Sequence, residues 1–289
     1  DYTVQDNRIK KLYELGKELN WNVELDIDWS RPFKPLTEPE PIFWDDYVPY
    51  KKLSDNKKVD FLNHRLAWSQ SQFLHGEQGA LLVASQLTSC APTFNAKLYA
   101  ASQTFDEARH VEAFNKYIQT RTKMMYPIGN ALKSILDKIL TDPRWDLKFI
   151  GMQVIIEGLA LAAFQASRDL TKDPVFRDML GLIIRDEARH VTFGINYLEE
   201  FVDTLTEQEK EDRAQFAYEA CWLSRERLVS TEVFEHFGMD AEEARQFQLS
   251  SDITQLFQKL LFSRVMPNLR RIGLLRDSVK EKFEDLGIL

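Results

Sequence analysis

The sequence predicts an all-α fold: a four-helix bundle in which one long crossover joins two helical hairpins, with an N-terminal wrap and extra C-terminal helices. Two observations predict it. From about residue 56 the apolar residues recur with a helical period, and no stretch alternates persuasively as a strand does. One five-residue motif also occurs twice, 80 residues apart. Turn signals lie between the glutamates of the apolar helical stretches and those of the motif, as two helical hairpins require.

Prolines and turn residues divide the chain into its elements. Residues 10–19 predict a short helix. Residues 26–49 contain five prolines and five aromatic residues, which predicts an irregular segment lying over the core. Long helices are expected near residues 57–89, 93–123, 144–170 and 174–204, and a short one near 129–140. A capping box of Thr206 and Glu209 begins a fifth long helix near 207–237. Asp240 begins a sixth helix, which Pro267 is expected to break.

Length and composition indicate one domain over residues 1–289, made of a wrap (1–55), a metal-binding bundle (56–204) and additional helices (205–289). The hydrophobic share of 44% and the charged share of 28% are typical of a globular protein. A net charge of −8 argues against a nucleic-acid partner, and we expect no membrane-spanning segment. Two cysteines are too few for a rubredoxin-type or zinc-ribbon site and suit the cytoplasm.

The repeated motif carries the candidate chemistry. Asp106-Glu-Ala-Arg-His110 and Asp186-Glu-Ala-Arg-His190 are identical. Residues three apart share one face of a helix, so Glu107 with His110, and Glu187 with His190, each present an oxygen and a nitrogen to one point. This pairing predicts two half-sites for metal.

Two further glutamates interrupt apolar helical stretches. Glu157 lies between Ile156 and the run Gly158–Phe164, and Glu77 lies within Phe73–Val83. An unpaired carboxylate in such a stripe would cost several kcal/mol or stay protonated, so a cation is expected beside it.

The spacing of the four glutamates is regular. Glu77 precedes Glu107 by 30 residues, and Glu157 precedes Glu187 by the same interval. A turn signal lies near the middle of each interval, so two antiparallel hairpins would bring the carboxylates to one height. The interval of 50 positions from Glu107 to Glu157 is enough for the long crossover of a ferritin-like bundle.

One Glu from each of two helices and Glu-x-x-His from each of the other two resembles the ferritin-like di-iron carboxylate superfamily. The resemblance implies two metal ions. Four carboxylates balance two divalent ions, and the mixed oxygen and nitrogen donors suit iron or manganese. We therefore expect two Fe, with Mn/Fe as an alternative, held by Glu77, Glu107, His110, Glu157, Glu187 and His190.

The motif is similar to that of bacterial multicomponent monooxygenase hydroxylase subunits and, less closely, of the ribonucleotide reductase small subunit. In those families the Asp before each Glu-x-x-His orients the histidine of the opposite helix. The resemblance therefore implies that Asp186 orients His110 and that Asp106 orients His190. Residues 71–80 and 28–32 also resemble a group of bacterial ferritin-like proteins that mostly lack an assigned reaction.

Departures from these families narrow the function. Phe114 stands where the reductase subunit has its radical tyrosine, and Glu77 stands where that subunit has Asp. Leu161 replaces the active-site threonine of methane-type hydroxylases. Ile183 stands where the p-aminobenzoate N-oxygenase type has a third histidine. The differences at Phe114 and Glu77 argue against a radical-generating role.

Apolar or small residues one turn from the ligands predict a substrate pocket, for which the candidates are Phe73, Leu81, Phe114, Leu161 and Gly194. We therefore expect an O2-activating non-haem di-iron oxidase or oxygenase that hydroxylates, N-oxygenates or desaturates a small organic substrate. A ferredoxin or reductase would supply electrons, and a homodimer is possible. The alternatives are a ferroxidase or iron-handling protein and a metal-bound ligand carrier.

Overall fold

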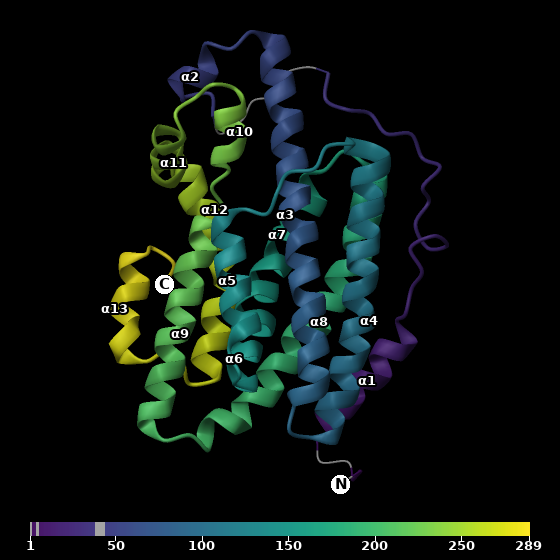
Figure 1. Ribbon diagram of the computed structural model, residues 1–289, viewed down its shortest axis with the longest axis vertical. Helices are drawn as coiled ribbons and strands as arrows, with labels where there is room; N and C mark the ends of the chain where they lie inside the picture. The colour runs from purple at the N-terminus through teal and green to yellow at the C-terminus, as the bar shows by residue number, and fades with distance from the viewer. Residues whose placement is uncertain (1, 4–5, 38–43) are drawn as a thin grey trace.

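A computed structural model describes residues 2–3, 6–37 and 44–289, and within these residues all regular structure is helical (Figure 1). This confirms the all-α prediction. The helices are α1 (Asn7–Glu18), α2 (Val48–Lys51), α3 (Asp55–Cys90), α4 (Phe94–Tyr117) with a π-helical end η1 (Ile118–Thr122), α5 (Asn130–Thr141), α6 (Trp145–Phe149) continuing through the π-helix η2 (Ile150–Ile156) into α7 (Glu157–Leu170), α8 (Pro174–Asp203), α9 (Glu207–Glu226), α10 (Thr231–His236), α11 (Ala241–Ser250), α12 (Asp252–Arg271) and α13 (Asp277–Asp285).

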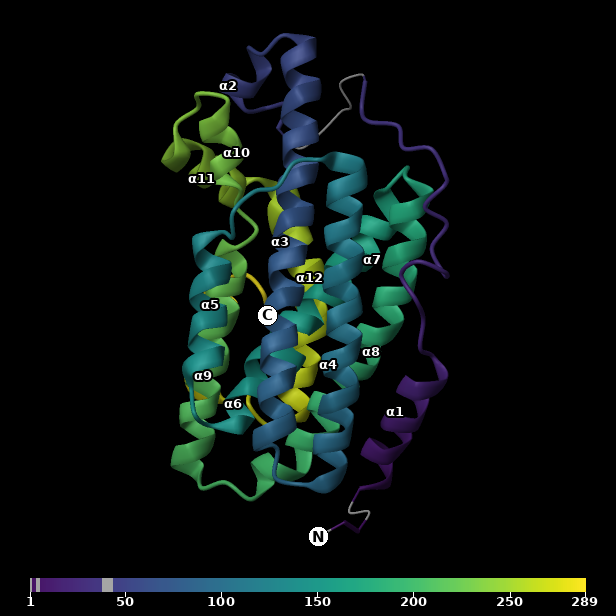
Figure 2. The ribbon, with the colours of Figure 1, turned by 45° about the vertical axis from the view of Figure 1, so that its right-hand side comes forward.

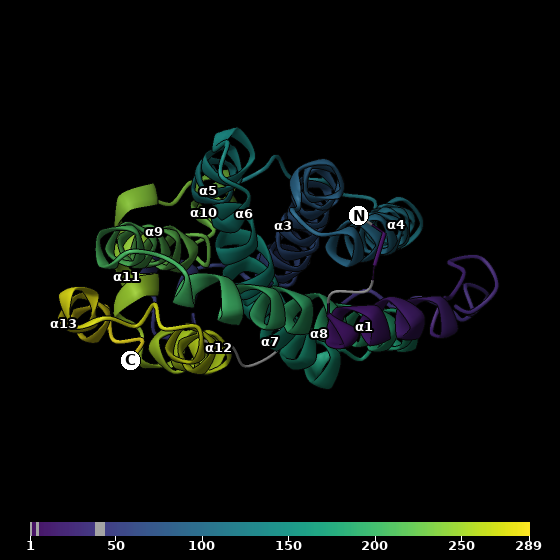
Figure 3. The same cartoon turned by 90° about the horizontal axis from the view of Figure 1, so that it is seen from below.

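Two helical hairpins form the bundle. Helix α3 packs along α4, and α7 packs along α8 (Figures 1 and 2). Seen from below, the α3–α4 pair lies over the α7–α8 pair (Figure 3). Side-chain caps begin the second helix of each hairpin, since Thr93 accepts from the backbone N–H of Ala96 and Asp173 accepts from that of Val175. The segment from η1 to α5 makes the long crossover that the spacing predicted.

The stretch Trp145–Leu170 is long and apolar enough, by length and composition, to cross a membrane. The sequence was expected to contain no apolar run of this length, and on that point the prediction is wrong. The physical reason is the position of this helix in the bundle, where α8, α9 and α12 all contact it. In its most apolar window 83% of the residues are buried within the protein, as expected of a core helix that is covered on most sides.

The N-terminal residues lie over the bundle as the sequence predicted, in the parts that the structure describes. Helix α1 contacts α4 and α8. Beyond it, Trp21, Val23 and Ile27 are buried against an apolar cluster that includes Phe114 and Phe176. Farther on, Trp44 and Tyr47 pack into a second cluster with residues of α3 and α10. Residues 38–43 of the predicted segment lie outside the described residues.

The C-terminal helices differ from the predicted ones. The predicted capping box and the predicted Asp240 cap are both confirmed, because Thr206 pairs reciprocally with Glu209, and Asp240 accepts from the N–H of Glu243. The fifth helix, however, ends at Glu226 and not near residue 237. Ser230 explains the break, since its backbone N–H and hydroxyl both donate to the Gln248 side chain, at 3.3 and 3.2 Å, instead of continuing a helix.

The sixth predicted helix is two helices, α11 and α12, separated at Ser251. Pro267 does not break α12, which continues to Arg271. The described residues also contain the C-terminal helix α13, which the sequence pattern did not predict.

Candidate metal centre

Four bundle helices bring six donor side chains together. Glu77 comes from α3, Glu107 and His110 from α4, Glu157 from the first position of α7, and Glu187 and His190 from α8. Each of them is at most 5% exposed. The π-helical turn η2 directly precedes Glu157, and such wider turns are frequent at functional sites.

The donors form two overlapping groups. One contains Glu77, Glu107, His110 and Glu187, and the other contains Glu107, Glu157, Glu187 and His190; the donor atoms within each group lie within 4.8 Å of one another. Glu107 and Glu187 belong to both groups. The arrangement therefore provides two cation positions that share two carboxylates. Each position has in addition one carboxylate and one histidine that the other position does not use.

Imidazole Nδ1 atoms point into both groups. His110 Nδ1 lies 3.0 Å from Glu77 Oε2 and 3.1 Å from Glu187 Oε1. His190 Nδ1 lies 3.1 Å from Glu107 Oε1 but makes no hydrogen bond there. In both histidines Nδ1 is consequently the nitrogen available to a cation.

The donor set fits a pair of metal ions. Buried oxygens of Glu107, Glu157 and Glu187 have no hydrogen-bond partner among the described residues, and neither does His190 Nδ1. An unpaired buried carboxylate oxygen is costly, and three in one place would be untenable without positive charge. Two divalent cations would balance the four glutamates and accept all of these lone pairs.

The pKa shifts of the donors point the same way. Burial raises the pKa of Glu77, and the charge of Glu187 raises it further. Burial also raises the pKa of Glu157, against the opposing charge of His190. Burial disfavours the charged form of His110, but Asp186 and Glu107 outweigh it and raise its pKa well above the usual value. Glu77, Glu157 and His110 therefore favour their protonated forms in this cluster, and a metal ion would bind in competition with those protons.

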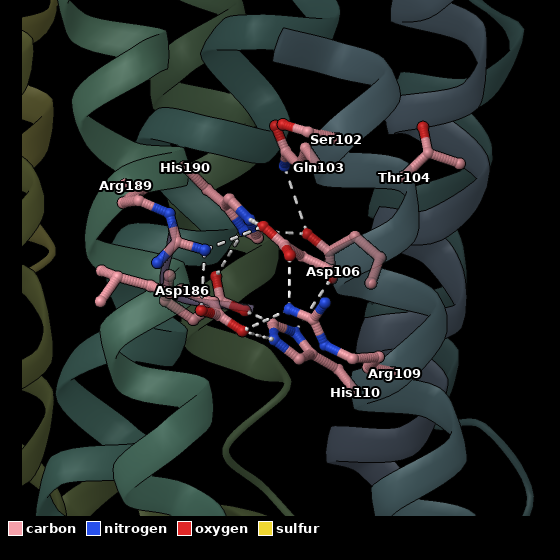
Figure 4. A network of polar contacts seen from close by, with 12 residues as sticks. Ser102, Gln103, Thr104, Asp106, Arg109, His110, Asp186, Arg189 and His190 are labelled. Atoms are coloured by element: carbon pink, nitrogen blue, oxygen red, sulfur yellow. Dashed lines mark hydrogen bonds and ion pairs between the residues drawn. The ribbon is translucent and has the colours of Figure 1, made fainter. Parts of the chain in front are cut away.

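A second layer of charge surrounds the histidines (Figure 4). His110 Nε2 lies 3.2 Å from Asp186 Oδ2, and His190 Nε2 lies 3.2 Å from Asp106 Oδ2. These are the cross-helix contacts that the resemblance implied. Each aspartate accepts from the imidazole N–H, which fixes the tautomer that leaves Nδ1 free to bind metal.

Two arginines balance these aspartates. Arg109 donates to Asp106 and, over 3.1 Å, to Asp186. Arg189 donates to Asp106 and Asp186 over 3.0 and 2.7 Å. Two carboxylates and two guanidiniums thus form a buried neutral quartet.

Sequence reasoning assigned no role to two polar neighbours of the centre. The Trp21 indole N–H donates to Asp186 Oδ2 over 2.6 Å, although 165 residues separate them. Gln103 donates to Glu157 Oε1 over 2.8 Å and to Glu107 Oε1 over 3.2 Å. The sequence could have indicated Gln103, because this residue lies one turn before Glu107 on the same helix face. Nothing in the sequence indicates that Trp21 lies beside Asp186.

A small cavity of about 20 Å³ lies beside the carboxylates, which is room for about one water molecule. It is lined by Phe73, Ala80, Ile156, Ala160, Phe164 and Arg227, together with the donors Glu77, Glu157 and Glu187. Its walls are mostly apolar, as the sequence predicted. An organic substrate must widen it on entry.

The predicted pocket residues are placed as follows. Phe73 lines the cavity, whereas Leu81, Phe114, Leu161 and Gly194 are not part of its lining. Phe114 is fully buried behind Phe73, with ring centroids 5.8 Å apart. Gln153 packs directly against Gly194 and leaves no room for a side chain there, because a Cβ atom at position 194 would lie 2.6 Å from Gln153 Cβ. A position one helical turn from a metal-binding residue was therefore not enough to predict which residues line the cavity.

The model of one protein family, p-aminobenzoate N-oxygenase AurF, matches residues 3–273. The chain belongs to this family. It is therefore an O2-activating oxidoreductase of the ferritin-like di-iron superfamily, as the motif indicated. Ile183, fully buried in an apolar cluster, stands where the N-oxygenase type was expected to have a third histidine, so this member lacks that histidine.

Solved structures support the same fold. An R2-like ligand-binding oxidase variant with an aerobically reconstituted Mn/Fe cofactor superposes with a TM-score of 0.58, at 18% identity, over 93% of this chain and 95% of that one. A form with an anaerobically reconstituted Mn/Fe cofactor gives 0.56 at 18% identity, over 93% and 94%. No curated protein sequence matches the chain.

Replacing Asp106 or Asp186 by asparagine is expected to lower Fe(II) affinity by roughly 10–100-fold, the usual effect of losing a carboxylate that orients a metal-bound histidine. The neutral amide accepts a weaker hydrogen bond from the imidazole and leaves the two arginines short of one negative charge. Competition of each variant with a chelator for Fe(II) measures the affinity. Asp137→Asn, on the exposed face of α5, is the control; unchanged affinity in both test variants would contradict the assigned role.

Proposed function

We propose that the chain is a di-iron N-oxygenase that uses O2 to oxidise the amino group of a small organic substrate. The observation that carries the proposal is the convergence of four glutamates and two histidines as two overlapping donor groups beside an apolar cavity. Membership of the N-oxygenase family favours the amine over the hydroxylation and desaturation outcomes that the sequence left open.

The two irons would be held by Glu77, Glu107, His110, Glu157, Glu187 and His190, with Glu107 and Glu187 shared. When bound, they supply the electron transfer that reduces O2. An amine then becomes a hydroxylamine by R–NH2 + O2 + 2e⁻ + 2H⁺ → R–NHOH + H2O. The two electrons require an external donor, for which a ferredoxin or a flavin reductase is proposed.

The remaining residues position the donors and exclude water. Asp106 and Asp186 hold the histidine tautomers, and Gln103 holds Glu107 and Glu157 through one amide group. Phe73 and Phe164 line the cavity and contact each other at 4.9 Å between ring centroids. Apolar walls keep bulk water from the reacting atoms and leave the substrate as the oxidisable group.

The test is transfer of an oxygen atom. Fe(II)-loaded protein with a chemical reductant is mixed with isotopically labelled O2 and a panel of aromatic and aliphatic amines, and products are analysed by mass spectrometry. We expect one labelled oxygen atom per hydroxylamine, with Glu157→Ala as the inactive control. O2 consumption that produces only Fe(III), at a rate that no amine changes, would instead support an iron-handling protein.

A further inference from the structure

The internal repeat relates the two metal positions to each other. A shift of 80 positions along the chain places Glu77 on Glu157 and His110 on His190. The two positions therefore have matching donors. We name them by the carboxylate that only one of them uses: the Glu77 position also uses His110, and the Glu157 position also uses His190.

The side chains behind these donors do not match. The same shift of 80 positions places Gln103 on Ile183, and it places Phe73 on Gln153. Both glutamines are fully buried, whereas Ile183 and Phe73 belong to one apolar cluster. One side of the centre thus has a pair of amides where the other side has a pair of hydrocarbon side chains.

The Gln103 amide acts on the donors of the Glu157 position. Gln103 points toward the centre from α4 (Figure 4), and its NH2 group donates to Glu157 Oε1 over 2.8 Å and to Glu107 Oε1 over 3.2 Å. The Glu107 oxygen that it holds is the one that faces His190, 3.1 Å from Nδ1, while Glu107 Oε2 faces His110. One amide group therefore fixes two of the oxygens around the Glu157 position.

Gln153 fixes the direction of the Gln103 amide. An ionised carboxylate only accepts hydrogen bonds, so the NH2 group of Gln103 faces the glutamates and its oxygen faces away from them. The NH2 group of Gln153 approaches that oxygen at 3.5 Å. Gly194 leaves the space that Gln153 occupies, since a Cβ atom there would lie 2.6 Å from Gln153 Cβ. The two amides thus form a chain that ends on the carboxylates.

No amide holds Glu77. Its one hydrogen-bond contact with a described residue is with His110 Nδ1, at 3.0 Å. Glu77 is also the most exposed of the six donors, at 5%, and it lines the cavity beside Phe73. The Glu77 carboxylate is therefore less firmly held than that of Glu157 before a cation binds.

We propose that the Gln103–Gln153 pair makes the two metal positions unequal, so that the Glu157 position binds its cation first and more tightly. A group that holds a metal-binding carboxylate in place lowers the cost of ordering it, and its loss usually lowers metal affinity by roughly 10–100-fold. A neutral amide does this without changing the balance between four carboxylates and two divalent ions. Gln103 is thus a positioning residue. The inference rests on the proposed di-iron centre and not on the oxidation of an amine.

The experiment measures Fe(II) binding without O2, in variants that keep one metal position each. Glu77→Ala keeps the Glu157 position, and Glu157→Ala keeps the Glu77 position. Gln103→Leu is then added to both, because leucine is of similar size and makes no hydrogen bond. Competition with a chelator gives each dissociation constant, and circular dichroism melting verifies folding. Gln119→Leu, at an exposed position of η1, is the matched control.

We expect the Glu157 position to bind Fe(II) roughly 10–100-fold more tightly than the Glu77 position. Gln103→Leu should remove most of this difference by weakening the Glu157 position, and it should leave the Glu77 position nearly unchanged. Gln153→Leu should give a smaller loss at the Glu157 position, because the Gln103 amide is still present but no longer fixed in direction. Gln119→Leu should change neither position.

A spectroscopic measurement checks the order of filling in the chain with all six donors. With one equivalent of Mn(II), electron paramagnetic resonance of the wild type should show mainly single bound ions, and the signal of coupled pairs should grow only with the second equivalent. Gln103→Leu makes the positions more alike, so coupled pairs should already form at one equivalent. A bundle that was only destabilised would bind less metal without this change in order.

Two outcomes would overturn the proposal: equal Fe(II) affinities of the two single-position variants, or an equal loss at both positions on Gln103→Leu. An absence of Fe(II) binding by both single-position variants would contradict the ligand assignment, and this inference with it. Binding that follows the expected pattern, in a protein that oxidises no amine, would contradict the proposed N-oxygenation alone.

Discussion

The Glu157→Ala variant is expected to bind about one equivalent of Fe(II) per chain where the wild type binds about two. Glu157 belongs to only one of the two donor groups, so its loss leaves Glu77, Glu107, His110 and Glu187 complete. Without its carboxylate the second position retains one histidine and two shared glutamates, and a second divalent ion would leave the centre with an excess positive charge in a buried site. O2-dependent turnover should fall below detection, because one iron cannot supply both electrons.

Matched variants make this result specific. Glu77→Ala should lose the opposite position and also retain about one equivalent. Glu107→Ala removes a carboxylate common to both groups and should retain close to none. Glu112→Ala, an exposed glutamate on the same helix as Glu107, should retain two. Metal content after desalting, measured by inductively coupled plasma mass spectrometry, checks all four, and two equivalents in Glu157→Ala would disprove the ligand assignment.

The second large effect concerns radicals: reaction of the Fe(II)-loaded protein with O2 is expected to leave no long-lived tyrosyl radical. Phe114 lies one helical turn after His110, is fully buried, and has no phenolic hydrogen to give. The substrate is then the preferred reductant. Electron paramagnetic resonance after rapid mixing measures the radical, and a stoichiometric, persistent tyrosyl signal would favour a radical-generating subunit instead.

Two buried tyrosines, Tyr99 and Tyr117, are the alternative hydrogen donors. Tyr99 lies within electrostatic range of His190 and Glu157, whereas Tyr117 donates to Asp173 over 2.6 Å. The Tyr99 hydroxyl has no hydrogen-bond partner in the described part of the chain, and burial raises its pKa. Without an acceptor for its proton, oxidation of Tyr99 is unfavourable.

Variants at these positions provide the controls. Phe114→Tyr places a phenol one turn from a metal ligand and should produce a tyrosyl signal that the wild type lacks. Tyr99→Phe should behave as the wild type does. A radical that appears in the wild type and disappears in Tyr99→Phe would show that Tyr99 is oxidised despite its missing proton acceptor.

The sequence by itself determined the bundle and the donor set. Both depend on local order along a helix: a repeated Glu-x-x-His places two donors on one face, and a carboxylate within an apolar stripe marks a buried site whatever surrounds it. The equal Glu77–Glu107 and Glu157–Glu187 intervals then set the height of each carboxylate. These features follow from the rise and the period of the α-helix, which are the same whatever its sequence.

Only the tertiary structure decided what surrounds the donors. Trp21 reaches Asp186 across 165 residues, and Arg227 reaches the cavity because α9 ends at a turn that Ser230 and Gln248 hold, with no glycine or proline to signal it. Which apolar residues face the cavity depends on how each helix is rotated, and the wider turn η2 changes that rotation just before Glu157. Contacts between distant segments have no period along the chain, so no local pattern in the sequence could indicate them.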